Sequence, residues 1–165
     1  MLVIGIDPGT ATTGYGLVRE ERDGTLTALA HGVITTPAKD TLPERLVQIH
    51  DGLSQIITLH RPQSGAVEKL FFQRNVKTAI SVAQGRGVAM LALAQAGMDV
   101  GEYTPLEVKL SVVGYGGADK RQVQHMVRAL LGLEDIPKPD DAADALAVAI
   151  CHLHSIKTQS LYYSE

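Results

Sequence analysis

The sequence predicts one α/β domain built on a five-stranded mixed sheet with helices on both faces. Its 165 residues are 45% hydrophobic, which is enough for one sizeable core. Apolar runs typical of three strands come first, and helical and strand-like stretches then alternate. This order favours three antiparallel strands followed by parallel additions.

The opening segment contains the three expected antiparallel strands. The apolar run Leu2–Ile6 is typical of a strand buried on both faces, and Asp-Pro-Gly at 7–9 ends it with turn-forming residues. Strand-like stretches follow at 14–18 and 26–35. The charged connection between them contains Asp-Gly, which favours a hairpin.

The rest of the chain alternates between the two kinds of element. Apolar residues at helical spacing run from Leu42 to Leu59, and Gly65–Glu68 predicts a fourth strand. An Ala- and Gly-rich helix is expected at 76–96 and a fifth strand at 99–103. Further helices are expected at about 106–113, 120–131 and 140–154. Residues 1–156 would then form the domain, with a loose tail at 157–165.

No membrane segment or secretion signal is expected. The sequence has no run of about 18 apolar residues, and its first apolar run is not preceded by basic residues. The single cysteine, Cys151, lies among apolar residues and has no second cysteine to pair with. These observations favour a cytoplasmic protein with an inert core thiol.

Charge is distributed unevenly along the chain. The net charge is -3, yet residues 69–128 carry 8 basic and 4 acidic side chains between two acidic ends. A basic middle segment is compatible with a phosphate-facing surface beside an acidic metal site. A patchwork of solvated surface charges explains the same count equally well.

Acidic residues interrupt apolar sequence in three separate segments. Asp7 ends the first expected strand and Glu68 the fourth, while Asp141 and Asp144 lie three apart on one face of the last expected helix. Each has a structural explanation, since Asp-Pro-Gly forms turns and acids favour the first turn of a helix, which Asp140 would cap. Partly buried carboxylates are costly unless they are paired or bind a metal. Together the four acids therefore predict one shared cation site.

The ligand types favour Mg²⁺, with Mn²⁺ as a substitute. Carboxylate oxygens suit such hard cations, whereas Zn²⁺ would ask for His or Cys at a spacing that the sequence lacks. Two ions about 3.5 to 4 Å apart could activate water on one side of a phosphodiester and stabilise the leaving oxygen on the other. The acids thus predict hydrolysis of a nucleic-acid backbone with two ions per site.

Several blocks in the right order resemble the RuvC family of bacterial Holliday junction resolvases, from residue 2 to about residue 154. They are Gly5-Ile6-Asp7-Pro8-Gly9-Thr10 with Thr13-Gly14-Tyr15-Gly16, Glu68 followed by Phe71, Gln84-Gly85-Arg86-Gly87, Val112-Val113-Gly114, Gln122-Val123-Gln124-His125-Met126-Val127 and Asp141-Ala142-Ala143-Asp144-Ala145-Leu146-Ala147. The resemblance implies a ribonuclease-H-like fold and a homodimer. It also implies Mg²⁺-dependent paired nicking of two like-polarity strands of four-way junction DNA, with the branch-migration proteins RuvA and RuvB as partners.

The resemblance assigns roles to individual residues. The family's catalytic and metal-binding acids fall on Asp7, Glu68, Asp141 and Asp144. Some relatives have His at the position of Asp141, so this ligand is the most replaceable. The aromatic residue that stacks on an opened base falls on Phe71, and the phosphate-contacting lysines fall on Lys109 and Lys120.

Other basic residues of the middle segment are weaker candidates for DNA contacts: Arg74, Lys77 and Arg121. Arg86 lies between Gly85 and Gly87, in a stretch of small residues that allows a helix to approach its neighbour closely. A dimer contact and tight packing on the sheet would each explain this stretch.

Three alternatives stay open. Sugar kinases, actin and Hsp70-type ATPases also begin with Gly-Ile-Asp and a Gly-Thr loop, but they need two such domains to close around a nucleotide. YqgF-like nucleases are nearer, although the Asp-Ala-Ala-Asp helix and the Gln-Val-Gln-His-Met block fit RuvC better. The retention of all four acids argues against a junction-binding protein that does not cleave.

Overall fold

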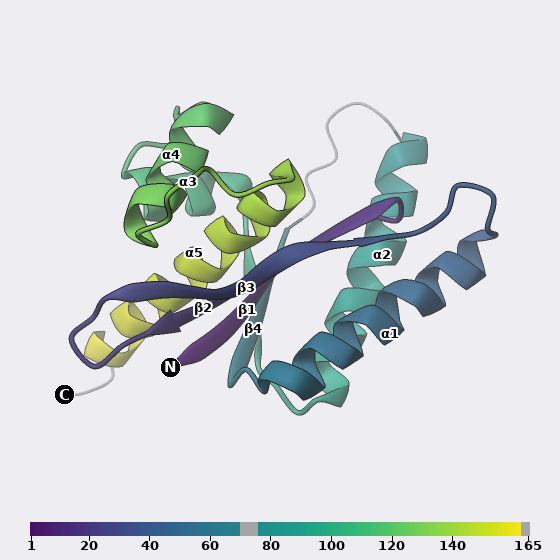
Figure 1. Ribbon diagram of the computed structural model, residues 1–165, viewed down its shortest axis with the longest axis horizontal. Helices are drawn as coiled ribbons and strands as arrows, with labels where there is room; N and C mark the ends of the chain where they lie inside the picture. The colour runs from purple at the N-terminus through teal and green to yellow at the C-terminus, as the bar shows by residue number, and fades with distance from the viewer. Residues whose placement is uncertain (70–75, 163–165) are drawn as a thin grey trace.

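A five-stranded mixed sheet lies between two layers of helices in the computed structural model, which describes residues 1–69 and 76–162 (Figure 1). The strand order is β3-β2-β1-β4-β5. β1, β2 and β3 pair antiparallel, whereas β4 and β5 continue the sheet in parallel from β1. The predicted architecture is therefore confirmed. The strands are β1 (Leu2–Asp7), β2 (Thr12–Glu20), β3 (Leu26–Thr35), β4 (Ser64–Glu68) and β5 (Val100–Tyr103).

Five helices in the described ranges cover the two faces of this sheet. One layer consists of α1 (Leu42–His60) and α2 (Val76–Gln95), and the other of α3 (Pro105–Val113), α4 (Lys120–Leu130) and α5 (Asp140–Tyr162) (Figure 1). The side chains of Thr104 and Asp119 accept hydrogen bonds from the backbone at the starts of α3 and α4. Among the described residues, no helix is both long and apolar enough to cross a membrane.

The two faces of β1 belong to two different cores, which explains its uninterrupted apolar sequence. Leu2, Ile4 and Ile6 pack toward α1 and α2. Val3, between them, packs toward α3, α4 and α5. A central strand buried on both faces has no polar side.

Glycines in β1 and β2 allow the backbone of α5 to lie directly on the sheet. A Cβ atom at Gly5 would come within 2.2 Å of the carbonyl oxygen of Ala145, and one at Gly14 within 2.0 Å of that of Asp141. No side chain fits in such a gap. Because Gly14 is the register partner of Asp7, the start of α5 lies over the end of β1.

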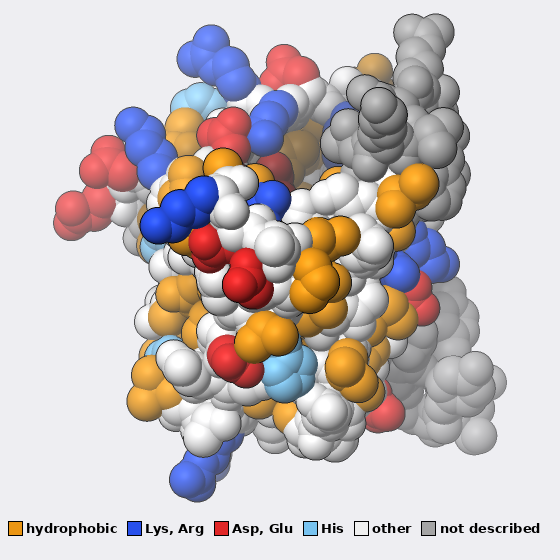
Figure 2. Space-filling view, turned by 90° about the vertical axis from the view of Figure 1, so that its right-hand side faces the viewer, with side chains coloured by type: hydrophobic (Ala, Val, Ile, Leu, Met, Phe, Trp, Pro, Cys, Tyr) orange, Lys and Arg blue, Asp and Glu red, His pale blue; other side chains and the backbone are white. Residues whose placement is uncertain are grey.

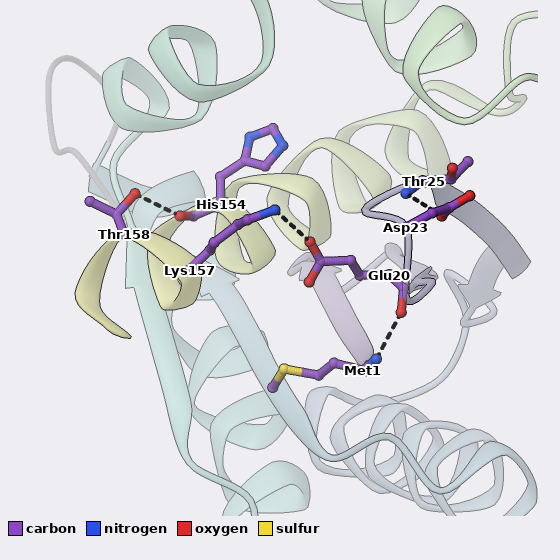
Figure 3. Close-up of polar contacts among 7 residues, drawn as sticks. All are labelled: Met1, Glu20, Asp23, Thr25, His154, Lys157 and Thr158. Carbon is purple, nitrogen blue, oxygen red and sulfur yellow. Dashed lines mark hydrogen bonds and ion pairs between the residues drawn. The ribbon is translucent and has the colours of Figure 1, made fainter. Parts of the chain in front are cut away.

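The C-terminal helix is longer than the sequence predicts. α5 continues to Tyr162, so residues 157–162 extend the helix and are not a loose tail. Lys157 Nζ lies 3.2 Å from Glu20 Oε1, and the Met1 ammonium donates a hydrogen bond of 2.8 Å to the Glu20 carbonyl oxygen (Figure 3). These contacts hold the end of α5 beside the N-terminus. The remaining residues of the expected tail, 163–165, lie outside the described residues.

Candidate active site

Three elements bring the four predicted acids to one end of the sheet. Asp7 is the last residue of β1 and Glu68 the last residue of β4, and these strands are parallel neighbours. Asp141 and Asp144 lie in the first two turns of α5, which contacts the sheet at Gly14. The convergence inferred from the sequence is therefore the arrangement that the fold produces.

Burial and mutual repulsion raise the pKa values of three of these carboxyl groups. Burial, followed by the negative charges of Asp144, Glu68 and Asp141, raises the pKa of Asp7 to about 7. Burial is also the largest cause of the raised pKa values of Glu68 and Asp144. Acids crowded in this way ionise together only when positive charge compensates them.

Lys120, the first residue of α4, places an ammonium group among these acids. Its Nζ lies 3.0 Å from Asp144 Oδ2 and 3.2 Å from Asp140 Oδ2. Burial lowers the pKa of Lys120, but the hydrogen bonds and charges of Asp144 and Asp140 together outweigh burial and raise it. Lys120 is therefore a charged, half-exposed cation beside the acidic cluster.

Asp140 does not cap α5, contrary to the prediction. The helix begins at Asp140 itself, and the carbonyl oxygen of Pro139 accepts the first hydrogen bonds, from the amides of Ala142 and Ala143. The Asp140 carboxylate instead pairs with Lys120 and accepts a hydrogen bond of 3.0 Å from Gln124 Nε2. The bond from Lys120, followed by that from Gln124, lowers the pKa of Asp140. The sequence contains no signal for this partnership, because α4 and α5 meet only in the fold.

A pocket of about 200 Å³ opens beside the acids on the side of α3 and α4. Lys109 and Lys120 line it together with Glu68 and Asp144, and the positive charges of the two lysines lower the pKa of Glu68 against the larger effect of its burial. Two cations next to a carboxylate cluster suit an anionic group such as a phosphate. The apolar part of the lining consists of Pro105, Val108, Val123 and Ala147.

The other predicted DNA-contacting residues lie elsewhere or cannot be placed. Arg121 is exposed on α4, next to Lys120. Phe71 and Arg74 lie outside the described residues. Lys77 is in α2, but its side chain also lies outside the described part of the structure.

The carboxylates do not form a ready-made metal site. Within residues 1–69 and 76–162, no group of three or more His, Cys, Asp or Glu side chains is arranged so that it could hold a metal ion. The donor set consists of carboxylate oxygens, which suits a hard divalent cation. Lys120 Nζ, 3.0 Å from Asp144 Oδ2, would compete with a cation for this carboxylate.

Comparison with known proteins gives a consistent result. The sequence matches the family described as crossover junction endodeoxyribonuclease RuvC over residues 3–152. A relative of that name from Syntrophomonas wolfei is 56% identical over 164 residues, which cover 99% of this chain and 95% of the relative.

Solved structures agree with the sequence match. The Thermus thermophilus RuvC structure superimposes with a TM-score of 0.90 at 36% identity and covers 96% of this chain and 97% of its own. T. thermophilus RuvC in complex with a Holliday junction substrate gives a TM-score of 0.87 at 34% identity, with 96% of both chains covered. The expected ribonuclease-H-like fold is confirmed. The chain therefore belongs to the RuvC family of crossover junction endodeoxyribonucleases.

Proposed function

We propose that this chain is a structure-selective endonuclease that resolves Holliday junctions in homologous recombination and DNA repair. It would nick two like-polarity strands of a four-way junction in the cytoplasm. The observation that carries the proposal is the convergence of four acids at the ends of β1 and β4 and the start of α5. Family membership and the junction bound by the T. thermophilus relative support the substrate.

The acids Asp7, Glu68, Asp141 and Asp144 would hold two Mg²⁺ ions, with Mn²⁺ as a substitute. When bound, the ions supply activation of water and stabilisation of the leaving oxygen. Lys120 would exchange Asp144 for a DNA phosphate, and Lys109, which lines the same pocket, would contact the neighbouring backbone. The two lysines thus orient the scissile strand against the carboxylates.

Four further residues complete the proposed DNA surface. Phe71 would stack on a base opened near the junction centre, and Arg121, exposed beside Lys120, would add a phosphate contact. Arg74 and Lys77 are proposed as phosphate contacts from their place in the basic middle segment of the sequence. The branch-migration proteins RuvA and RuvB are proposed partners on the basis of the family alone.

A homodimer would supply the two sites that paired nicking requires. The outer face of α1 and α2 carries exposed apolar side chains, among them Val47 with 58% of its surface exposed and Leu91 with 50%. Figure 2 shows apolar side chains gathered on the side of the molecule where these helices lie. A groove of about 470 Å³ runs between helices α1 and α2. We propose this face as the dimer interface, related by a twofold axis. The groove is lined by Leu46, Val47, His50, Asp51, Val88, Leu91 and Gln95.

The proposal is tested with synthetic four-way junctions and a linear duplex of matching sequence. In Mg²⁺ or Mn²⁺ the junction should be cut far faster than the duplex, at symmetric positions in two strands. Equal rates on both substrates would favour a general nuclease of the YqgF-like kind. Tight junction binding without cleavage in either metal would favour a junction-binding protein that does not cleave.

A further inference from the structure

The sheet itself does not join the two strand ends that carry Asp7 and Glu68. The ladder between β1 and β4 ends at the pair of Ile6 and Val67, one residue before the acids. Beyond it Asp7 pairs with Gly14 of β2, and Glu68 pairs with Tyr103 of β5. A contact from a neighbouring element would therefore add to the alignment that the last pair of the ladder gives to the two acids.

Helix α2 contacts the loop that follows Asp7. The hydroxyl groups of Ser81 and Thr10 are hydrogen bonded to each other. One helical turn later, a Cβ atom at Gly85 would lie only 3.3 Å from the carbonyl group of Gly9. The helix therefore rests on the Pro-Gly-Thr turn at 8–10, next to Asp7.

The adjacent residue of α2, Arg86, reaches the other strand end. Its Nε donates a hydrogen bond of 2.9 Å to the backbone carbonyl oxygen of Glu68. Its Nη2 forms an ion pair with Glu102 on β5, and 17% of the Arg86 side chain is exposed. A guanidinium fork can make both bonds at once from one fixed plane, which a lysine ammonium on a flexible chain cannot reproduce.

We infer that Arg86 is a positioning residue for the Glu68 carboxylate. By anchoring the Glu68 backbone from the helix that also supports the turn after Asp7, Arg86 fixes the spacing between the first two acids of the site. The inference rests on the proposed function, because it concerns the alignment of a carboxylate proposed to hold the cation. The contacts of Gly85 and Arg86 show that this part of the stretch of small residues packs against the strand ends, as one of the two explanations left open by the sequence expects.

The test uses Arg86→Met, which removes the donors and keeps an apolar stem of similar length. Mn²⁺ affinity of the free protein is measured by electron paramagnetic resonance, and junction cleavage is measured separately. Both should fall about 10- to 100-fold, as is typical when a residue that orients a metal ligand is lost. Junction binding in the absence of divalent metal should stay within about twofold of wild type, since phosphate contacts are untouched.

Two variants separate positioning from general structure. Glu102→Gln breaks the ion pair but leaves the bond from Arg86 to Glu68, so metal affinity and cleavage should change by less than about threefold. Arg86→Lys keeps a donor near the Glu68 carbonyl and should recover part of both activities. Thermal unfolding of each variant shows whether it is folded.

A double-mutant cycle decides the outcome. In a Glu68→Gln background, Arg86→Met should cause no further loss of Mn²⁺ affinity, because Arg86 acts through Glu68. An equal fold loss in both backgrounds, or no loss in either, would overturn the inference while leaving cleavage by the wild type as support for the proposed function. A wild type that neither binds Mn²⁺ nor cuts junctions would overturn both. If the Met variant does not fold, Arg86→Gln takes its place in the same cycle with the same outcomes.

Discussion

Among single residues, Asp7 is where the proposed function and the stability of the fold oppose each other. Burial and three neighbouring acids raise its pKa from an ordinary value of 3.8 to about 7. The folded state thus binds this proton more tightly than the unfolded state does. Stability is therefore lost as pH rises from 3.8 through 7, and one pKa unit corresponds to about 1.4 kcal/mol.

Replacing Asp7 by Asn should stabilise the metal-free protein and abolish cleavage. The gain in melting temperature should be larger at pH 8 than at pH 5, because only the carboxylate, not the amide, gains charge across this interval. Thermal unfolding in EDTA at both pH values measures this, and junction binding should persist. Retained cleavage would contradict the role of Asp7 as a ligand, and a gain that does not depend on pH would contradict its raised pKa.

Lys120 would compete with the proposed metal ion for Asp144. Lys120→Met should therefore raise the affinity of the free protein for Mn²⁺ by up to about fivefold, since a half-exposed ion pair is worth up to about 1 kcal/mol. The same change should slow cleavage, because the proposed phosphate contact is lost. Arg121→Met, at the exposed neighbouring position on α4, serves as the control and should leave Mn²⁺ affinity unchanged. A Lys120→Met variant with weaker Mn²⁺ binding would contradict competition.

At the scale of elements, the sequence predicts those helices and strands whose formation depends on residues close together in the chain. Apolar periodicity and turn residues located the strands and helices, and the strand ends located Asp7 and Glu68. The sequence does not predict the C-terminal part of α5. The ion pair between Lys157 and Glu20, which attaches this part of the helix to β2, joins residues that lie far apart in the chain. The partners of Lys120 and Arg86 were missed for the same reason. Such contacts depend on how helices dock, which periodicity does not encode.

The docking of α5 on the sheet depends on the absence of a side chain at Gly14. Gly14→Ala should cost about 1 to 3 kcal/mol and displace the start of α5, because the new Cβ would overlap the carbonyl oxygen of Asp141. Gly87→Ala is the matched control. Apart from the adjacent residues and the backbone of α2 itself, no atom of the described residues lies within 4 Å of a Cβ at Gly87, so the gain in helix propensity should make this change neutral or stabilising by up to about 1 kcal/mol.

Chemical denaturation and junction cleavage measure the two glycine variants. Gly14→Ala should lose both stability and activity, whereas Gly87→Ala should lose neither. A fully active Gly14→Ala protein would show that the position of Asp141 does not depend on this close contact.

For the whole molecule, the proposed dimer depends on the apolar face of α1 and α2. Leu91→Glu should convert the protein to a monomer, because it places a charge in the groove between these helices. Leu59→Glu is the control, since Leu59 is 75% exposed and does not line that groove. Sedimentation velocity measures the outcome. A monomer should nick one strand of a junction at a time, and a Leu91→Glu protein that stays dimeric would place the interface elsewhere.

The seating of α5 on glycines has a consequence for how protein and DNA adapt to each other. Two of the four acids belong to a helix that packs on one face of the sheet along most of its length, and Lys157 of this helix lies near the N-terminal residue. Shifting them would disturb the packed interior, which deforms reluctantly. In the proposed complex the backbone that carries Asp141 and Asp144 would therefore stay nearly fixed, and the branched DNA would supply most of the bending that brings a scissile phosphate into place.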